Sequence, residues 1–212
     1  MPYTSRHFIV WVIIILHLAG ALATVIPNLK EWIQPLTPVN LLICSLLLIS
    51  YRQERGRNFI IFFILTIAIG FSIEVLGVNT GYPFGTYWYG TTLGWKVFGV
   101  PVIIALNWFM LSYAFGTTLN RWKFISSLKV LLASLAMVAL DILIEPVAIT
   151  LNYWNWESST IPIQNYISWF LIAAIIQVLF QHFLPKEKND LSIPLIFSQV
   201  FYFVFIYIFS KF

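Results

Sequence analysis

The chain has 212 residues, of which 60% are hydrophobic and 9% are charged, whereas soluble domains carry about 25% charged residues. This composition excludes a water-soluble domain of any size, because the apolar segments and their short connections use the whole length. The net charge of +4 does not indicate nucleic-acid binding, since the cations stand singly or in small groups. One cysteine, Cys44, provides neither a disulfide nor a thiolate metal site.

Apolar stretches recur along the chain, and about 20 such residues in a helix cross roughly 30 Å of hydrocarbon. They predict an all-α transmembrane helix bundle with seven spans, forming a single domain over residues 1–212. In chain order, the predicted spans are Phe8–Ile26, Val39–Tyr51, Phe59–Val78, Val97–Phe115, Ser126–Leu151, Ile163–Leu184 and Ile193–Ser210. The second span is short unless Trp32–Pro38 contributes an entry turn.

The distribution of cations predicts the orientation, because Lys and Arg are enriched in cytoplasmic loops. With the N-terminus inside, nine of the twelve Lys and Arg residues fall on the cytoplasmic side and the C-terminus lies outside. These nine are Arg6, Arg52, Arg55, Arg57, Arg121, Lys123, Lys129, Lys186 and Lys188. The other three are Lys30, Lys96 and Lys211. We therefore expect a multi-pass protein of the inner cell membrane.

The first span has an alternative interpretation as a signal peptide. Arg6, the apolar run after it and the segment Ala21-Leu22-Ala23 resemble a signal peptide with its cleavage site. The run of about 19 residues exceeds the usual 7–15, which favours a retained helix. Cleavage would leave six spans and the same orientation.

Three carboxylic acids lie inside the predicted spans, where ionisable side chains are costly and indicate functional sites. Asp141 and Glu145 are four residues apart, so they share one face of a helix. Glu74 reaches a similar depth in the third span, counted at 1.5 Å per residue. A carboxylic acid that stays protonated can act as a general acid. Alternatively, the three acids join neighbouring helices by hydrogen bonds.

Polar and aromatic residues accompany these acids. Asn107 and Asn165, in the fourth and sixth spans, could hold water or join helices. The connection after Glu74 interleaves glycines with aromatic residues, namely Tyr82, Phe84, Tyr87, Trp88, Tyr89 and Trp95. Across the same face lie Tyr153, Trp154 and Trp156. These aromatics form either an interfacial belt or a loop folded over a site, where their faces would attract a carbocation.

The segment from Glu74 to Tyr87, with the sequence EVLGVNTGYPFGTY, resembles the carotenoid hydratase family of the CruF type. The resemblance extends roughly over residues 70–170. It includes Leu93-Gly94, Gly99-Val100-Pro101, Trp108, Asp141, Glu145-Pro146 and Trp154-Asn155-Trp156. One departure is Glu145, since many members of the family have Asp before this proline. Glutamate keeps the carboxyl group and places it one methylene group further from the backbone.

The resemblance implies hydration of the terminal 1′,2′ double bond of an acyclic carotenoid, without cofactor or metal, to give a tertiary C-1′ alcohol. Asp141, Glu145 and Glu74 would be catalytic, one donating the proton and another orienting or deprotonating water. The candidate substrate-binding residues are Tyr82, Phe84, Tyr87, Trp88, Asn107, Trp108, Trp154, Trp156 and Asn165. The expected partners are the carotenoid in the bilayer and water, with other carotenoid-pathway enzymes as further candidates.

Two alternatives stay open at this point. A carotenoid end cyclase would start with the same protonation, but an internal alkene would trap the cation. A proton-coupled transporter could use the same three acids, although paired broken helices typical of such proteins are not evident. A retinal protein would need a lysine within the last span, and Ile193–Ser210 has none. An intramembrane prenyltransferase would need two acid-rich motifs, and the chain has one acidic pair.

Overall fold

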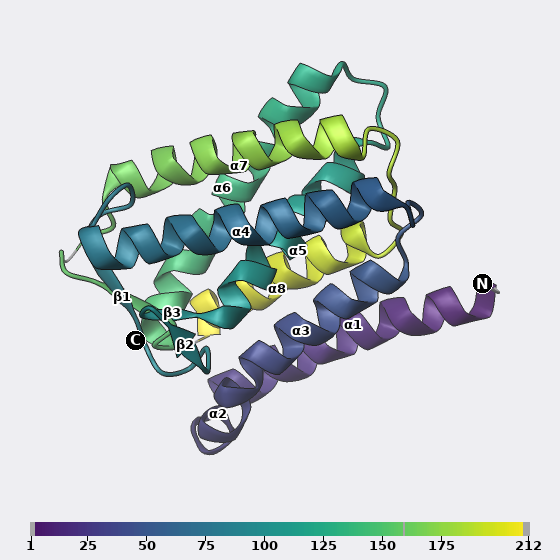
Figure 1. Cartoon of the computed structure of the whole chain (residues 1–212). Coiled ribbons are helices and arrows are strands. Elements are labelled where there is room, and N and C mark those ends of the chain that lie inside the picture. Colours follow the sequence, from purple (N-terminus) through teal and green to yellow (C-terminus); the bar gives the residue numbers. More distant parts are fainter. Residues whose placement is uncertain (1–2, 159, 210–212) are drawn as a thin grey trace.

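The computed structural model describes residues 3–158 and 160–209 (Figure 1). Seven helical segments in these ranges are long and apolar enough to cross a membrane, which confirms the predicted all-α bundle. In chain order the helices are α1 (Tyr3–Val25), α2 (Pro27–Ile33), a 3-10 turn (Gln34–Leu36), α3 (Thr37–Ser50), α4 (Arg57–Thr80), α5 (Val102–Leu119), α6 (Ser126–Thr150), α7 (Ile163–Phe183) and α8 (Ser192–Phe209). Which side of the membrane the N-terminus faces stays a prediction.

The predicted entry turn, Trp32–Pro38, is part of the second span. Helix α2, the 3-10 turn and α3 form one segment, Pro27–Ser50, that is long enough to cross a membrane. The fourth span differs from its prediction, Val97–Phe115, at both ends. Lys96–Val97 (β2) pairs with Val100–Pro101 (β3) in a hairpin, so α5 begins only at Val102. At its other end α5 continues through Gly116 to Leu119. The predicted end of the last span, Ser210, lies outside the described residues.

Helix α5 is the central helix of the bundle. In an 18-residue window, 72% of α5 is buried, against 17% to 44% in the other six segments. Close packing around α5 depends on small residues. A Cβ on Gly70 of α4 would lie 2.6 Å from the side chain of Trp108, and a Cβ on Gly116 would lie 2.7 Å from the ring of Phe180. Glycine at both positions therefore lets α4 and α7 approach α5.

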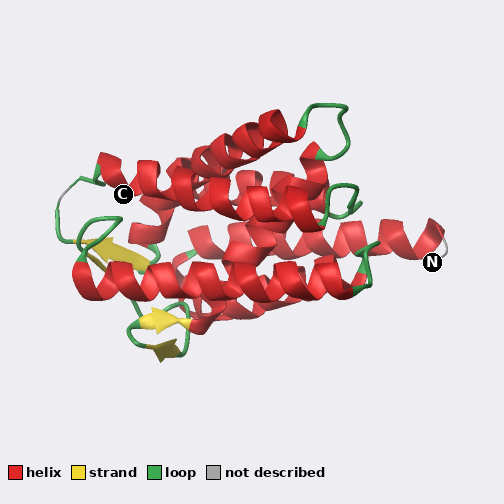
Figure 2. Ribbon diagram, turned by 45° about the horizontal axis from the view of Figure 1, so that its top comes forward, coloured by secondary structure: helices red, strands yellow, loops and turns green. Residues whose placement is uncertain are grey.

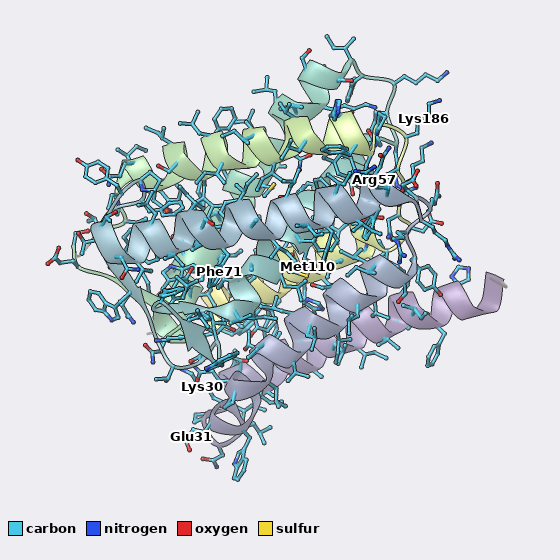
Figure 3. All side chains as sticks on the ribbon, viewed as in Figure 1. Lys30, Glu31, Arg57, Phe71, Met110 and Lys186 are labelled. Carbon is cyan, nitrogen blue, oxygen red and sulfur yellow. The ribbon has the colours of Figure 1, made fainter. Side chains whose placement is uncertain are left out.

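The two ends of the bundle differ in charge. Figure 3 places Arg57 and Lys186 at one end and Lys30 at the other, as the distribution of cations predicts. At the end with Arg57, the connections α3–α4 and α7–α8 are held together by Glu187. Its carboxylate accepts hydrogen bonds from the backbone N–H groups of Gln53 and Glu54 at 2.8 Å each, and from Tyr113 Oη at 2.6 Å.

All four strands lie at the opposite end of the bundle (Figure 2). Tyr87–Tyr89 (β1), after α4, pairs antiparallel with Trp154–Trp156 (β4), after α6. The register sets Tyr87 opposite Trp156 and Tyr89 opposite Trp154. Because side chains alternate along a strand, Tyr87 and Tyr89 point inward and are buried, while Trp88 is half exposed. This small sheet closes the bundle above the carboxylic acids.

Candidate active site

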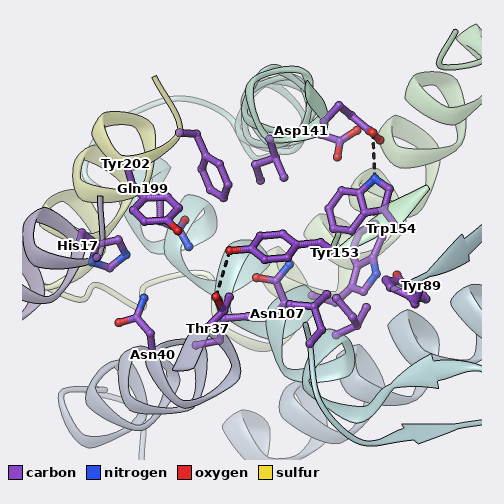
Figure 4. A pocket seen from close by; sticks show the side chains of 18 of the residues that line it. His17, Thr37, Asn40, Tyr89, Asn107, Asp141, Tyr153, Trp154, Gln199 and Tyr202 are labelled. Atoms are coloured by element: carbon purple, nitrogen blue, oxygen red, sulfur yellow. Dashed lines mark hydrogen bonds between the residues drawn. The ribbon is translucent and has the colours of Figure 1, made fainter. Parts of the chain in front are cut away.

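A cavity of about 400 Å³ lies inside the bundle, beneath the sheet of β1 and β4. Its lining includes all three intramembrane acids: Glu74 from α4, and Asp141 and Glu145 from α6. Each of these side chains is at least 97% buried. The structure therefore brings together the three acids whose similar depth the sequence predicted. Figure 4 shows the cavity, with Asp141 and Trp154 on one side and His17 and Gln199 on the other.

Glu74 accepts three hydrogen bonds. Trp108 Nε1 donates to Oε1 at 2.9 Å, and the hydroxyl groups of Tyr87 and Tyr89 donate to Oε2 at 2.5 and 2.7 Å. Burial, together with the nearby charge of Glu74, raises the pKa of both tyrosines. The two phenols therefore keep their protons and remain donors. Three donors around one carboxyl group match an ionised carboxylate, which only accepts.

Glu145 is held in a similar way by the other strand of the sheet. The indole Nε1 atoms of Trp154 and Trp156 donate to Oε2 at 2.9 and 3.0 Å. Asn165 Nδ2 of α7 donates to Oε1 at 3.1 Å. An indole N–H is a donor only, so a proton on Oε2 would have no room beside the two tryptophans. Glu145 is thus fixed as an acceptor.

Asp141 differs from the other two acids because it has one hydrogen bond. Asn165 Nδ2, the atom that also binds Glu145, donates to Asp141 Oδ2 at 3.2 Å. The second oxygen, Oδ1, is buried and has no hydrogen-bond partner among the described residues. An unpartnered polar atom in a protein interior is costly and calls for an explanation. Asp141 therefore has an oxygen available for a ligand in the cavity.

Aromatic rings form much of the cavity wall. Trp108 and Trp169 stack with centroids 4.2 Å apart, and Tyr87 packs against Trp156 at 5.2 Å. Ring faces attract cations electrostatically, and most strongly where water is excluded. Together with two hydrogen-bonded carboxylates, these rings can stabilise a positive charge that forms inside an apolar cavity.

Of the nine predicted substrate-binding residues, seven line the cavity and two do not. Those that line it are Phe84, Tyr87, Asn107, Trp108, Trp154, Trp156 and Asn165. Tyr82 and Trp88 are 75% and 50% exposed and lie outside the lining. Their position fits the interfacial belt that the sequence left as an alternative, and a role in substrate binding stays a prediction.

Other residues of the cavity were not assigned to the site from the sequence. Tyr89 would have followed from Tyr87 if a strand had been predicted, because side chains two apart share a face. Tyr153, next to Trp154, lines the cavity and contacts Thr37 through its hydroxyl group at 3.1 Å. His17 and Gln199 belong to helices that carry no part of the motif. The signal that could have found them is a polar side chain inside an apolar span.

The cavity reaches the surface of the bundle between α1 and α3. Ala19 of α1, Leu36 of the 3-10 turn and Val39 of α3 belong to its lining and are also exposed. Both α1 and α3 are parts of membrane-spanning segments. These exposed lining residues offer an apolar molecule a path to the acids from the side of the bundle.

Comparisons with known proteins agree with the sequence motif. Residues 36–212 match a family described as carotenoid biosynthesis protein. A bisanhydrobacterioruberin hydratase from Haloarcula japonica is 33% identical over 122 residues, which cover 52% of this chain and 40% of that protein. The chain thus spans less than half the length of this curated relative. No solved structure matches the chain.

Proposed function

Because the chain belongs to the carotenoid biosynthesis protein family, we propose that it hydrates the terminal 1′,2′ double bond of an acyclic carotenoid in the inner cell membrane. The product is a tertiary alcohol at C-1′. One observation carries the proposal: Glu74, Asp141 and Glu145 meet in an aromatic-walled cavity between membrane-spanning helices. The resemblance to a carotenoid hydratase at 33% identity supports the same class of reaction.

Asp141 is the general acid in this proposal. Glu74 and Glu145 each accept three hydrogen bonds, and this stabilises their ionised forms. Asp141 has one donor and a free Oδ1, so it is the acid best able to hold a proton. Donation of that proton to C-2′ breaks the π bond and leaves a tertiary cation at C-1′.

The cation is stabilised by its surroundings until water captures it. The rings of Trp108, Trp169 and Tyr87 line the cavity, and the carboxylates of Glu74 and Glu145 supply negative charge. The oxygen of one water molecule then forms a bond to C-1′. Glu145 takes the proton released by this water, and transfer of a proton between the paired acids returns Asp141 to its starting state. The net reaction adds one water and requires no redox change.

The substrate reaches the acids from the lipid phase. A C40 polyene is about as long as the bilayer is thick, whereas the cavity has a volume of about 400 Å³. One end of the molecule therefore occupies the cavity while the rest extends through the opening between α1 and α3. Water enters the cavity from the nearby membrane–water interface. Other enzymes of the carotenoid pathway are candidate partners that supply the substrate.

Expression in a host that accumulates an acyclic carotenoid tests the proposal. The expected product gains the mass of one water molecule at each modified end and carries a tertiary hydroxyl. A cyclised product would keep the mass of the substrate and would identify a cyclase. Unchanged pigment, with the protein present in the membrane, would contradict both reactions and favour a transporter.

A further inference from the structure

Asn107 of α5 is a polar residue of the cavity lining whose role the structure narrows. The sequence left two roles open for it, a hydrogen bond that joins helices or a contact with water. Its side chain is partly buried, and it precedes Trp108, which donates to Glu74. In Figure 4, Asn107 lies between the wall that carries Asp141 and the wall that carries Asn40. Asn107 therefore belongs to the interior of the cavity and not to its rim.

Asn107 does not join helices. The other asparagine predicted at this depth, Asn165 of α7, does so by donating to both acids of α6. Asn79 of α4 shows a second common arrangement, in which the amide donates to a carbonyl one turn back on its own helix, at 2.7 Å. In the part of the chain that the structure describes, the side chain of Asn107 makes neither kind of hydrogen bond. Its amide is thus available to a molecule in the cavity.

The donors that surround Glu74 and Glu145 are already engaged with these carboxylates. They are Tyr87, Tyr89, Trp108, Trp154, Trp156 and Asn165. Because each of their N–H or O–H groups points at a carboxylate oxygen, these six residues stabilise negative charge and do not direct water. The amide of Asn107 differs from them, since it presents an acceptor, Oδ1, and a donor, Nδ2.

Capture of a carbocation requires a water molecule with one lone pair directed at the carbon. Water has two O–H groups and two lone pairs. Asn107 Oδ1 can accept one O–H group. Glu145 can accept the other, because a carboxylate offers about four acceptor positions and Glu145 uses three of them. A lone pair then remains to form the bond to C-1′. Holding a nucleophile in a reactive orientation contributes strongly to rate.

We propose that Asn107 positions the water molecule that captures the cation, and thereby directs the reaction to hydration. The inference rests on the proposed hydratase function and assigns one residue to its second step. Asp141 forms the cation whether or not Asn107 is present. A cation that no water captures loses a proton from C-2′ to the carboxylate of Asp141 and returns to the alkene, so no net reaction occurs.

The two steps can be separated in D2O, where Asp141 carries a deuteron to C-2′. Mass spectrometry then measures both the hydrated product and the deuterium in recovered carotenoid. Asn107→Leu keeps the approximate shape of the side chain and removes its polar atoms. We expect the hydrated product to fall by about tenfold or more, while deuterium accumulates at C-2′ of the recovered carotenoid. Asn107→Ser supplies a hydroxyl group that can accept from water and should recover part of the hydration.

Gln177→Met is the control for a buried amide with a structural role. Gln177 Nε2 of α7 donates to the carbonyl of Ser112 on α5 at 2.8 Å, and Gln177 lies outside the cavity lining. This variant should have a lower Tm and an unchanged ratio of hydrated product to deuterated carotenoid.

The outcomes separate the role of Asn107 from the proposed function. Hydrated product at the wild-type level from Asn107→Leu would overturn the positioning role. An equal loss of hydration and of deuterium exchange in that variant would also overturn it, because Asn107 would then act in protonation or in folding. A wild-type protein that neither hydrates nor deuterates the carotenoid would refute the proposed function itself, and the inference with it.

Discussion

Asn165 donates one hydrogen bond to Asp141 Oδ2, at 3.2 Å, and leaves Oδ1 of the same carboxyl group unpartnered. The same amide nitrogen binds Glu145 Oε1 at 3.1 Å. One residue of α7 thus holds two acids of α6 in a fixed relation while their environments differ. Paired acids with different environments can divide the work of proton donor and proton acceptor. The proposed roles of Asp141 as proton donor and Glu145 as proton acceptor follow from this difference in environment.

Loss of the tyrosine hydroxyl groups that donate to Glu74 should lower activity while the rings continue to fill their places in the cavity wall. Tyr87→Phe and Tyr89→Phe each remove one hydrogen bond to Glu74. A hydrogen bond to a charged group contributes about 1.5–3 kcal/mol, so we expect a loss of activity of about tenfold or more per variant, measured as product per amount of membrane protein. Tyr207→Phe is the control, because Tyr207 is 54% exposed and lies outside the cavity lining. Equal activity in all three variants would contradict a role for the inward-facing tyrosines.

The close contact between Gly70 and Trp108 should be required for full activity. A Cβ at position 70 would lie 2.6 Å from the Trp108 side chain, so Gly70→Ala should displace the indole that donates to Glu74. Overpacking of this kind costs about 1–3 kcal/mol. We expect lower activity per folded molecule as well as a lower Tm. Gly116→Ala presses on Phe180, which lies outside the cavity lining, and should lower Tm with little effect on activity. Full activity in Gly70→Ala, together with a loss of activity in Gly116→Ala, would refute the inference that Gly70 positions Trp108 for the site.

A bulky residue at the opening between α1 and α3 should slow substrate entry. Ala19 lines the cavity and is exposed, so Ala19→Trp should lower kcat/KM several-fold while leaving the acids unchanged. Leu18→Trp adds the same indole to α1 at an exposed position outside the lining and should have no effect. Identical activities for the two variants would place the route of entry elsewhere.

The predicted orientation can be tested by cysteine labelling in whole cells, after Cys44, which is buried, has been replaced. With the N-terminus inside, residues 52–57 and 186–188 face the cytoplasm and residues 79–96 face outward. A membrane-impermeant thiol reagent should label Thr91→Cys and should leave Glu54→Cys unlabelled until the cells are permeabilised. Rapid labelling at position 54 in intact cells would reverse the topology.

The sequence predicted the helices well because hydrocarbon imposes a length and a composition on each span. It also predicted that Glu74 lies at a similar depth to the acids of α6, counted at 1.5 Å per residue. It did not predict the sheet of β1 and β4, because two three-residue strands carry too few side chains to produce a periodic pattern. Tyr89, although named among the aromatic residues of the loop, was not assigned to the site for that reason. The positions of His17 and Gln199 in the cavity depend on how α1 and α8 pack, which no local pattern records.

The most direct test of the account is the activity of Asp141→Asn in a host that supplies an acyclic carotenoid. Asparagine keeps the shape and the hydrogen bond to Asn165 but has no acidic proton, so hydrated product should fall by a factor of about 100 or more, in line with acid–base catalysis. Glu145→Gln should lose activity to a similar degree, and Glu74→Gln less if it stabilises the cation without transferring a proton. Protein levels should be unchanged or higher, because the amide variants remove buried groups that can ionise. Hydrated product at the wild-type level from Asp141→Asn would contradict the assignment of Asp141 as the proton donor.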